Sequence, residues 1–362
     1  MLSSRGRPLT FAEAIREGTL QSMESDPRVI VVGEGVPDPK AIFGTTSGLR
    51  ERFGTERVFD MPLAESGMTG ICIGAALSGI RPVMVHQRID FALLAMDQLV
   101  NNAAKWHYMF SGKASVPLVV RMIVGRGWGQ GPQHSQSLQG MFGQVPGLKV
   151  VMPTTAYDAK GMLMAAIEDD NPVLFIEHRW LYHVEDDVPE GIYRVPIDKA
   201  RVLHEGSLVT VAAFSYMALE ALIAARALLA SMSIDVEVID MRSVRPLDVD
   251  TVVDSVRKTG YLIVADTAFR TGSIAGELIS QVIELAFGDL KAAPVRIASP
   301  DHPVPTSPHM SENYYPTPRS IVDAVIRLLG RSKNTFEYDE VLKAVTRIGP
   351  LDVPNKEFSG PF

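Results

Sequence analysis

Two side chains that could do chemistry follow strand-like segments in the first half of the chain. Glu65 lies in MPLAESG, between the apolar lead-in at Val58–Phe59 and a run of small residues. His134 lies in the glycine-rich stretch GRGWGQGPQHSQS. Both follow the carboxyl end of a predicted strand, where open α/β sheets bind their ligands. A helix start at such a place often receives a phosphate, but the carboxylate of Glu65 would repel one, so a different ligand is needed.

The imidazole of His134 can change charge near neutral pH and act as a general acid or base. A single loop histidine is more often structural, and on the residues alone both interpretations stay open. Its polar neighbours Gln133, Ser135 and Gln136 favour the functional one. The glycines of this loop match neither the G-x-x-x-x-G-K-[ST] phosphate loop nor G-x-G-x-x-G before a helix.

Residue spacing excludes several other kinds of site. His178 and His183 stand five residues apart, which does not place them on one helical face to bind zinc. The chain has no G-x-S-x-G nucleophile elbow. Cys72, in an apolar helical stretch, is typical of a small core residue. Phe91, at the start of an apolar helical stripe, is on pattern alone also a core residue.

A row of small residues follows Glu65 at three- and four-residue spacing, which is one face of a helix: Gly67, Gly70, Gly74 and Ser78. Glycine inside a helix costs about 1 kcal/mol relative to alanine. Such a row indicates that a neighbour approaches this face closely. The neighbour can be another helix of the same chain or another subunit.

The composition is that of a globular protein long enough for two domains, with 362 residues, 46% hydrophobic and 21% charged. The net charge of −7 and the lack of a basic run exclude a general nucleic-acid or anionic-membrane surface. The single cysteine excludes an internal disulfide framework. We find no signal peptide and no apolar run long enough for a membrane span, and therefore expect a cytoplasmic protein.

Strands alternate with helices as far as residue 178, which predicts a doubly wound α/β domain. Thr10 and Glu13 have capping-box spacing before a helix expected over 11–23. The strands are short continuous apolar runs, as in a parallel sheet that is buried on both faces. Further helices are expected over 47–53, 66–79, 91–110 and 155–167.

The stretch 180–206 contains charges, prolines and glycines, and its sequence predicts no helix or strand. After it, strands and helices alternate again. We therefore expect a first domain over 1–195, a linker over 196–206 and a smaller α/β domain over 207–330. Residues 331–362 show no clear period and predict a surface arm.

Five segments carry a resemblance to a known family: FDMPLAESGMTGICIGAALSGIRPVM, AMDQLVNNAAKWHYM, GPQHSQSL, PGLKVVMPTTAYDAKGMLMAAIEDDNPVLFIE and VEVIDMRSVRPLDVDTVVDSVRKTGYLIVAD. Over about residues 8–330 the chain resembles the beta subunit of thiamine-diphosphate-dependent 2-oxo acid dehydrogenases. That subunit belongs to the decarboxylating component of pyruvate and branched-chain 2-oxo acid dehydrogenase complexes. The resemblance implies a pyrimidine-binding domain of the transketolase-like superfamily, followed by a transketolase C-terminal-type domain.

The same resemblance implies roles for three residues. Glu65 matches the family's glutamate that hydrogen-bonds a ring nitrogen of the cofactor's aminopyrimidine and so favours the imino tautomer, whose nitrogen deprotonates the thiazolium carbon. Phe91 matches the aromatic residue on the aminopyrimidine face. His134 matches the active-site histidine beside the substrate and the acyl acceptor, where it can donate a proton or orient the acceptor.

The resemblance also implies two bound metal ions. Some members hold a structural monovalent cation, K⁺, mainly through carbonyl oxygens, at positions matching Leu118, Ala166, Ile167, Asp169 and Asn171. Thiamine enzymes hold the diphosphate through Mg²⁺ on Gly-Asp-Gly and paired asparagines, but here GEG at 33–35 stands too far from Asn101–Asn102. An alpha subunit is therefore expected to supply the metal and phosphate contacts, commonly in an α2β2 heterotetramer with a second beta subunit.

The implied activity is oxidative decarboxylation of a 2-oxo acid, pyruvate or a branched-chain one, with acyl transfer to the lipoyl domain of an acyltransferase. Three departures from the family pattern concern the substrate and acceptor: VHQRIDF at 85–91, GRGWGQG at 125–131 and RIASPDHPVPTSP at 296–308. They keep an alternative open, transfer of the acetyl or other acyl group to a small biosynthetic carbonyl acceptor, which gives an acyloin. Glu65 and His134 disfavour a non-catalytic scaffold.

Overall fold

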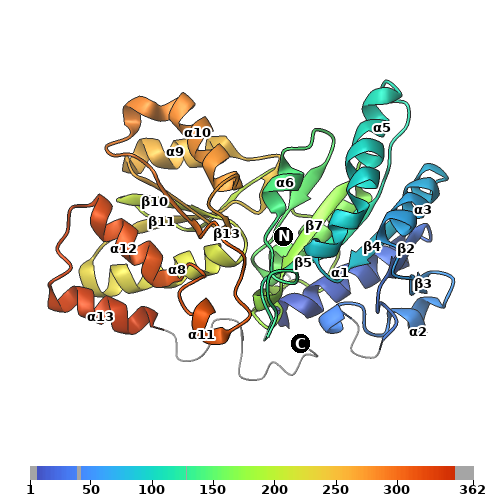
Figure 1. The fold of residues 1–362 in the computed structure, drawn as a ribbon, viewed down its shortest axis with the longest axis horizontal. Helices are drawn as coiled ribbons and strands as arrows, with labels where there is room; N and C mark the ends of the chain where they lie inside the picture. The colour runs from blue at the N-terminus through green and yellow to red at the C-terminus, as the bar shows by residue number, and fades with distance from the viewer. Residues whose placement is uncertain (1–5, 39–41, 128, 347–362) are drawn as a thin grey trace. The chain divides into compact units, whose positions relative to one another are not determined.

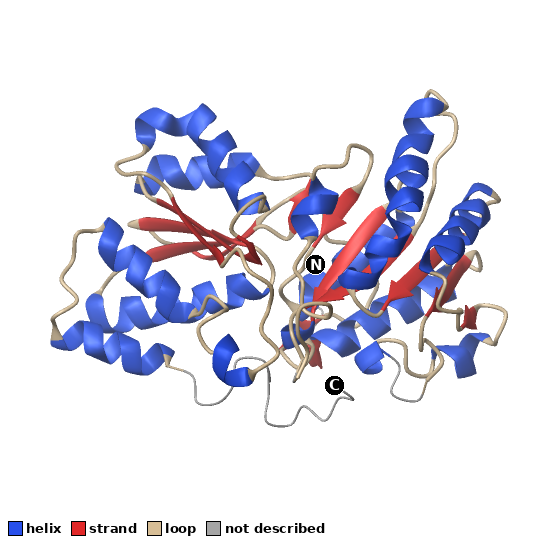
Figure 2. Cartoon of the chain, viewed as in Figure 1, coloured by secondary structure: helices blue, strands red, loops and turns tan. Residues whose placement is uncertain are grey.

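Two α/β units make up the chain in a computed structural model that describes residues 6–38, 42–127 and 129–346. The first unit comprises the described residues up to Arg126 and those from Gln133 to Ile197. The second comprises the described part of 127–132 and the described residues from Asp198 on. In each unit, helices flank a sheet (Figures 1 and 2). None of the described helices is long and apolar enough to cross a membrane.

A parallel sheet forms the centre of the first unit, with strand order β6-β7-β5-β4-β2-β3. Side chains on both faces of these strands are buried, because helices cover the sheet from either side. The fold is therefore the expected doubly wound α/β arrangement. The strands are β2 (Val29–Gly33), β3 (Val58–Phe59), β4 (Arg81–His86), β5 (Val119–Val124), β6 (Lys149–Val151) and β7 (Val173–His178).

The strand order reverses between β2 and β4. From β2 the chain runs outward to β3, and it then returns past β2 to form β4 and β5 on the other side. The loops after β2 and β4 thus leave the carboxyl edge of the sheet in opposite directions. Doubly wound sheets bind their ligands at such a switch point.

Helices of the first unit lie where right-handed crossovers place them. α1 (Phe11–Ser25) and α7 (Ala156–Glu168) pack together, while α3 (Glu65–Leu77) packs on β4 and on residues 93–103. α1 begins at the predicted capping box: the Thr10 hydroxyl accepts from the Glu13 N–H at 3.2 Å, and the Glu13 carboxylate accepts from the Thr10 N–H at 2.9 Å. Shorter helices are α2 (Leu49–Phe53), α6 (Gln139–Gly143), η1 (Ile42–Gly44) and η4 (Arg179–Leu181).

The single helix expected over 91–110 is wrong, because this segment is a chain of shorter helices: α4 (Ile89–Ala92), η2 (Leu93–Ala95), η3 (Gln98–Ala103) and α5 (Ala104–Met109). η3 is a π-helical turn, which is wider than an α-helical one. In it Asn101 Nδ2 donates to Asp97 Oδ1 at 2.8 Å. The spacing of apolar residues does not reveal such widening, because the buried stripe changes little.

The second unit contains a sheet of order β14-β13-β10-β11-β9, parallel except for the antiparallel edge strand β9. α8, α12 and α13 pack together and bury their apolar faces in one core with β10 and β11. α9 and α10 pack together against β10 and β13. The elements are β9 (Arg201–His204), β10 (Val209–Ala213), α8 (Tyr216–Met232), β11 (Val236–Asp240), β12 (Ser243–Arg245), α9 (Val249–Thr259), β13 (Leu262–Phe269), α10 (Ile274–Ala286), η5 (Phe287–Asp289), β14 (Val295–Ser299), α11 (Pro308–Ser311), α12 (Pro318–Leu328) and α13 (Phe336–Val345).

Two strands lie in the stretch 180–206, for which the sequence predicts no element. β8 (Glu185–Val188) pairs antiparallel with β1 (Arg7–Thr10), and β9, inside the expected linker 196–206, pairs antiparallel with β11. Both are edge strands with many exposed or half-buried residues. They lack the apolar runs that mark strands buried on both faces.

The expected arm at 331–362 contains a helix, α13. Thr335 caps it by accepting from the Tyr338 N–H at 3.2 Å. Tyr338, Val341 and Val345 are buried in the core that α13 shares with α8 and α12. Three apolar residues at helical spacing are a weak signal in a short segment, which explains why the sequence alone did not predict this helix. The remainder of the expected arm, 347–362, lies outside the described residues.

Candidate active site

Glu65 is the first residue of α3 and is buried, with 7% of its surface exposed. Ala64 at the N-cap has no side chain that could cap the helix, so the first N–H groups of α3 have no N-cap side chain as an acceptor. Thr69 donates its hydroxyl to the Glu65 carbonyl at 2.7 Å and fixes this turn. A carboxylate in the first turn is stabilised by the helix dipole. The structure therefore places a buried acidic group at the carboxyl edge of the sheet, beside the switch point.

Glu34, directly after β2, faces Glu65 across the switch point. Burial raises the pKa of the Glu34 carboxyl, and the negative charges of Glu65 and Asp60 and a hydrogen bond with Glu65 act in the same direction. Its Oε1 atom is buried without a hydrogen-bond partner among the described residues. The two carboxyl groups therefore lie close enough to interact, and the protonated form of Glu34 is favoured relative to that of an ordinary carboxyl group.

The sequence analysis missed Glu34. The signal was present, because an apolar strand ended by Glu-Gly puts an acid at the carboxyl edge of the sheet. Asp60 supports the same edge by accepting from the N–H groups of Gly35 at 3.0 Å and of Met61 at 2.9 Å.

The raised pKa of Glu34 predicts a pH dependence of stability. The folded state holds this proton more tightly than the unfolded state, so the stabilisation is complete below the ordinary carboxyl pKa of 4.5 and is lost as the pH rises through the raised value. In Glu34→Gln, the free energy of unfolding should fall less over this range than in the unmodified protein. Urea titrations at a series of pH values measure this, with the exposed Glu284→Gln as the control. Parallel curves for Glu34→Gln and the unmodified protein would contradict the assignment.

Phe91 and His134 lie together although 43 positions separate them in the sequence. Phe91 lies in α4, after β4, and His134 follows β5, the neighbouring parallel strand. Their ring centroids are 5.2 Å apart and the rings meet edge to face at 82°. His134 is exposed and Phe91 is half-buried. The structure therefore brings two of the predicted site residues into contact at the same edge as Glu65.

His86, which ends β4, is buried close to this edge. Burial lowers the pKa of its imidazole to about 4. Neither ring nitrogen has a hydrogen-bond partner among the described residues. His86 is therefore neutral near pH 7, whereas His134 is exposed at the same edge and can contact a ligand.

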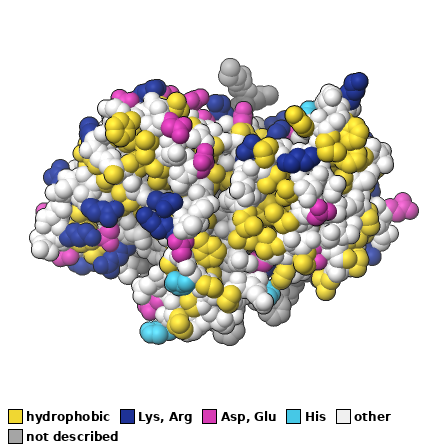
Figure 3. Space-filling view, turned by 45° about the horizontal axis from the view of Figure 1, so that its top comes forward, with side chains coloured by type: hydrophobic (Ala, Val, Ile, Leu, Met, Phe, Trp, Pro, Cys, Tyr) yellow, Lys and Arg dark blue, Asp and Glu magenta, His cyan; other side chains and the backbone are white. Residues whose placement is uncertain are grey.

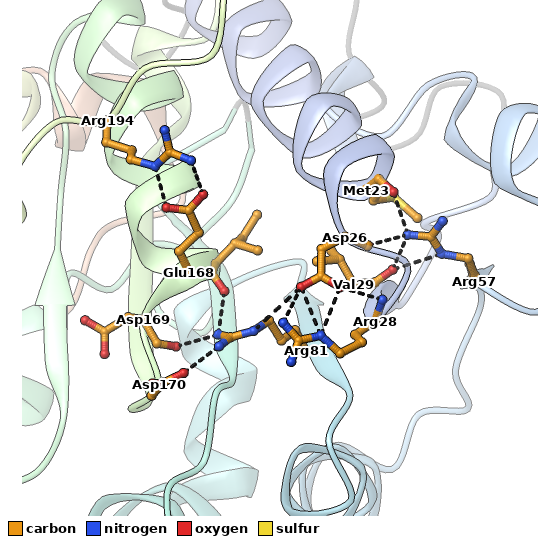
Figure 4. A network of polar contacts seen from close by, with 11 residues as sticks. Met23, Asp26, Arg28, Val29, Arg57, Arg81, Glu168, Asp169, Asp170 and Arg194 are labelled. Atoms are coloured by element: carbon orange, nitrogen blue, oxygen red, sulfur yellow. Dashed lines mark hydrogen bonds and ion pairs between the residues drawn. The ribbon is translucent and has the colours of Figure 1, made fainter.

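The residues that match the cation site lie at the opposite, amino edge of the sheet. Arg81, the first residue of β4, donates Nη1 to the carbonyl oxygens of Ile167 and Asp169, each at 3.0 Å (Figure 4). The Leu118 carbonyl accepts from the Val173 N–H at 2.9 Å. These are main-chain carbonyl oxygens, which can bind K⁺, but a cation would share two of them with the guanidinium of Arg81. Its role here would be structural, remote from Glu65 and His134.

Arg81→Met should lower the free energy of unfolding by about 1.5–3 kcal/mol, because it removes charge-assisted bonds to the two carbonyls and to Asp170. Urea unfolding measures the loss. Arg52→Met is the matched control, since the Arg52–Glu24 pair is exposed and should change stability by less than about 1 kcal/mol. Equal effects of the two substitutions would show that Arg81 only makes a surface contact.

The small-residue face of α3 is not covered by another part of the described chain. A Cβ atom at Gly67 or Gly74 would meet nothing within 4 Å, and one at Gly70 would meet only Gln98. Ile71 beside them is 63% exposed. The opposite face of α3 is buried and includes Cys72, where burial raises the thiol pKa to about 12, as expected of a core cysteine. Among the described residues, Gln98 alone comes within 4 Å of a Cβ atom built at these glycines, so most of this face is open.

Among the described residues, no group of three or more His, Cys, Asp or Glu side chains is arranged to hold a metal ion.

Comparison with known proteins matches two family models: transketolase, pyrimidine binding domain, at residues 7–184, and transketolase, C-terminal domain, at residues 198–321. The chain is 42% identical to the acetoin:2,6-dichlorophenolindophenol oxidoreductase subunit beta of Cupriavidus necator, over 91% of this chain and 99% of the relative. It is 40% identical to the pyruvate dehydrogenase E1 component subunit beta of Rickettsia felis, over 88% of this chain and 97% of the relative. A solved split-gene transketolase, an inactive beta4 tetramer, matches in fold with a TM-score of 0.74 at 24% identity, covering 89% of this chain and 99% of its own.

Proposed function

Because the chain belongs to the family of beta subunits of pyruvate dehydrogenase E1 components and acetoin oxidoreductases, we propose that it supplies the aminopyrimidine half of a thiamine diphosphate site in a 2-oxo acid dehydrogenase formed with an alpha subunit. The observation that carries the proposal is the buried pair of Glu65 and Glu34 at the switch point of the sheet. The family relationship supports the class of reaction. The buried pair of carboxyl groups supports the assignment of Glu65 and Glu34 to the cofactor site.

The side chains at this edge fit an aminopyrimidine. The buried carboxylate of Glu65 can accept a hydrogen bond from a protonated ring nitrogen. Burial and the neighbouring acidic charges raise the pKa of Glu34, which favours a hydrogen bond between this carboxyl group and that of Glu65. The Phe91 ring offers an aromatic face to a flat heterocycle. When bound, thiamine diphosphate supplies an acidic thiazolium carbon and an electron sink for decarboxylation.

His134 is proposed to act on the substrate and the acyl acceptor. Its ring is exposed, so a second molecule can reach it, and its edge contact with Phe91 orients it. From a ring nitrogen it can donate a proton to a carbonyl oxygen, or hydrogen-bond the acceptor in the orientation needed for transfer.

The alpha subunit is proposed to hold Mg²⁺ and the diphosphate, and two copies of each chain to form an α2β2 heterotetramer. A K⁺ ion at the carbonyls near Arg81 and a lipoyl-bearing acyltransferase as acceptor belong to the same proposal. The buried single cysteine fits a reducing cytoplasm.

The exposed face of α3 is proposed as the surface on which another subunit packs. Hydrophobic side chains gather in the right-hand part of Figure 3, the part of the view in which Figure 1 places α3 and α5. An apolar surface with this many large side chains usually marks a protein interface. The exposed residues near these elements are Leu63, Ile71, Leu77, Leu94, Tyr108, Met109 and Phe110.

Gly74→Met tests this interface. Within the chain the added side chain meets open space and methionine favours a helix, so the thermal stability of the isolated chain should not fall. Assembly with the alpha subunit should weaken by at least about 10-fold, since each buried clash costs 1–3 kcal/mol. Size-exclusion chromatography with light scattering measures it, with Gly288→Met as the control, also in open space. Unimpaired assembly of Gly74→Met would exclude this face.

Co-purification with the alpha subunit tests the function itself. Reduction of a dye acceptor should require both chains and a 2-oxo acid, and pyruvate should be compared with branched-chain 2-oxo acids. Acetoin belongs in the panel because it is named as the substrate of two relatives. It is also an acyloin, the kind of product that the second candidate function forms when it transfers the acyl group of a 2-oxo acid to a small carbonyl acceptor. Activity of the isolated chain would contradict the proposal that the site is shared with an alpha subunit. Formation of an acyloin from a 2-oxo acid and a small carbonyl compound, without acyl transfer to a lipoyl domain, would replace the first function by the second.

A further inference from the structure

A buried ion pair lies beside Phe91, formed by Arg88, the N-cap residue of α4, and Asp90 in its first turn. Arg88 Nε donates to Asp90 Oδ2 at 3.2 Å, and the two side chains are 5% and 3% exposed. Burying two charges costs free energy unless each is well hydrogen-bonded. Each member of the pair therefore needs further hydrogen bonds, and its partners in those bonds show what the pair holds in place.

The carboxylate of Asp90 binds the far end of the loop that carries His134, residues 125–137, here termed the histidine loop. Asp90 Oδ1 accepts from the Gln136 N–H at 3.2 Å and from Gln136 Nε2 at 3.0 Å. Gln136 stands two residues after His134. Asp90 thereby ties the backbone next to the histidine to the residue that precedes Phe91.

The guanidinium of Arg88 binds the near end of the histidine loop. Arg88 Nη2 donates to the Gly125 carbonyl at 2.7 Å. Gly125 has a positive φ of 92°, and a Cβ atom there would stand 2.7 Å from His178 Cε1. The backbone at Gly125 is thus held on one side by Arg88 and leaves no room for a side chain on the other.

We propose that Arg88 and Asp90 are positioning residues that clamp both ends of the histidine loop and so hold His134 against Phe91. Their roles are set by geometry: Arg88 binds the start of the loop, Asp90 binds its end, and the ion pair joins the two. Asp90 also precedes Phe91 in the chain, so the turn that holds the loop also sets the ring contact at 5.2 Å. The proposal deepens the proposed function, because it assigns what orients its histidine.

Hydrogen exchange in the complex with the alpha subunit tests the clamp without turnover. Asp90→Asn keeps the size of the side chain but removes the charge that Arg88 and Gln136 share. Amide exchange over 133–137 should rise at least about 10-fold, because the opening of the loop becomes easier. Asp254→Asn, which breaks the exposed Arg257 pair of 3.3 Å, is the control and should leave these amides unchanged. Unchanged exchange in Asp90→Asn overturns the clamp.

A double-mutant cycle tests whether the clamp acts through His134. If it does, Asp90→Asn should lower kcat for acyl transfer to a lipoyl domain by about 10- to 100-fold with a smaller effect on KM, as for a misplaced catalytic group. The same substitution in the His134→Ala background should have almost no further effect. Independent, multiplicative effects would overturn the positioning role. Asp90→Glu, which keeps the charge, should recover part of the activity and serves if Asp90→Asn does not fold.

The two readouts separate this inference from the proposed function. If the complex turns over no 2-oxo acid while exchange at 133–137 still rises in Asp90→Asn, the clamp stands and the proposed function falls. If exchange rises but turnover is normal in Asp90→Asn, the positioning of His134 falls and the proposed function stands.

Discussion

Glu65→Gln in the complex with the alpha subunit should lower kcat by about 10²- to 10⁴-fold, the usual contribution of a positioned acid or base. Glutamine keeps the size of the side chain but presents a neutral amide, which neither carries the negative charge nor shares a proton with Glu34. The folded state should change little, because loss of a charge in the first turn of α3 costs about 0.3–1 kcal/mol. Steady-state dye reduction, with thermal unfolding of the same preparation, measures both effects.

The matched control is Glu277→Gln, which also removes a carboxylate from the first turn of a helix, α10, but at an exposed position in the second unit. It should retain the activity of the unmodified complex. A Glu65→Gln complex with normal kcat would contradict the role of Glu65. A complex that loses activity together with its thermal stability would show a structural defect instead.

His134→Ala should lower kcat by about 10²-fold when a lipoyl domain or a small carbonyl compound is the acceptor. The loss with a dye should be smaller, because a dye takes electrons without being oriented by the histidine. The substitution should change the free energy of unfolding by less than about 0.5 kcal/mol, since the ring is exposed. Parallel assays with the two kinds of acceptor on one preparation measure the difference.

His309→Ala provides the control for His134→Ala, because His309 is 91% exposed and lies in the second unit. It should leave both assays unchanged. Equal losses with dye and lipoyl acceptors would move the role of His134 from the transfer step to an earlier step of the reaction. No loss in either assay would remove His134 from the site.

The elements that the sequence predicts well are those whose local signals agree with their burial. The capping box of Thr10 and Glu13 and the apolar strands β2, β4, β5 and β7 were expected and are present. The strands β8 and β9 and the helix α13 were not, because partners distant in the sequence stabilise them. An edge strand pairs with only one neighbouring strand, and α13 is held in the core by only three buried side chains, so both leave a weak apolar pattern in the sequence.

The residues of the site also divide into those that local sequence signals reveal and those that only the folded chain reveals. Local spacing drew attention to Glu65 and His134, and the family resemblance supplied their roles and that of Phe91. The raised pKa of Glu34 became visible only in the folded sheet, where β2 pairs with β3, because this pKa depends on burial and on neighbouring charges. No periodic pattern in the sequence marks the Arg88–Asp90 pair. Its partners stand some 35 to 45 residues away along the chain, so only the folded sheet shows what the pair holds.

The pairing of β1 with β8 bears on how the protein is made. Arg7 pairs with Val188, at opposite ends of the first unit's sequence, and α1 packs on α7. Ribosomes add roughly 5–20 residues per second, so the first strand and helix wait on the order of ten to thirty seconds for their partners. During that time the apolar face of α1 has no native surface to cover it. Chaperone binding to the nascent chain should therefore begin at α1 and end once β8 has been synthesised.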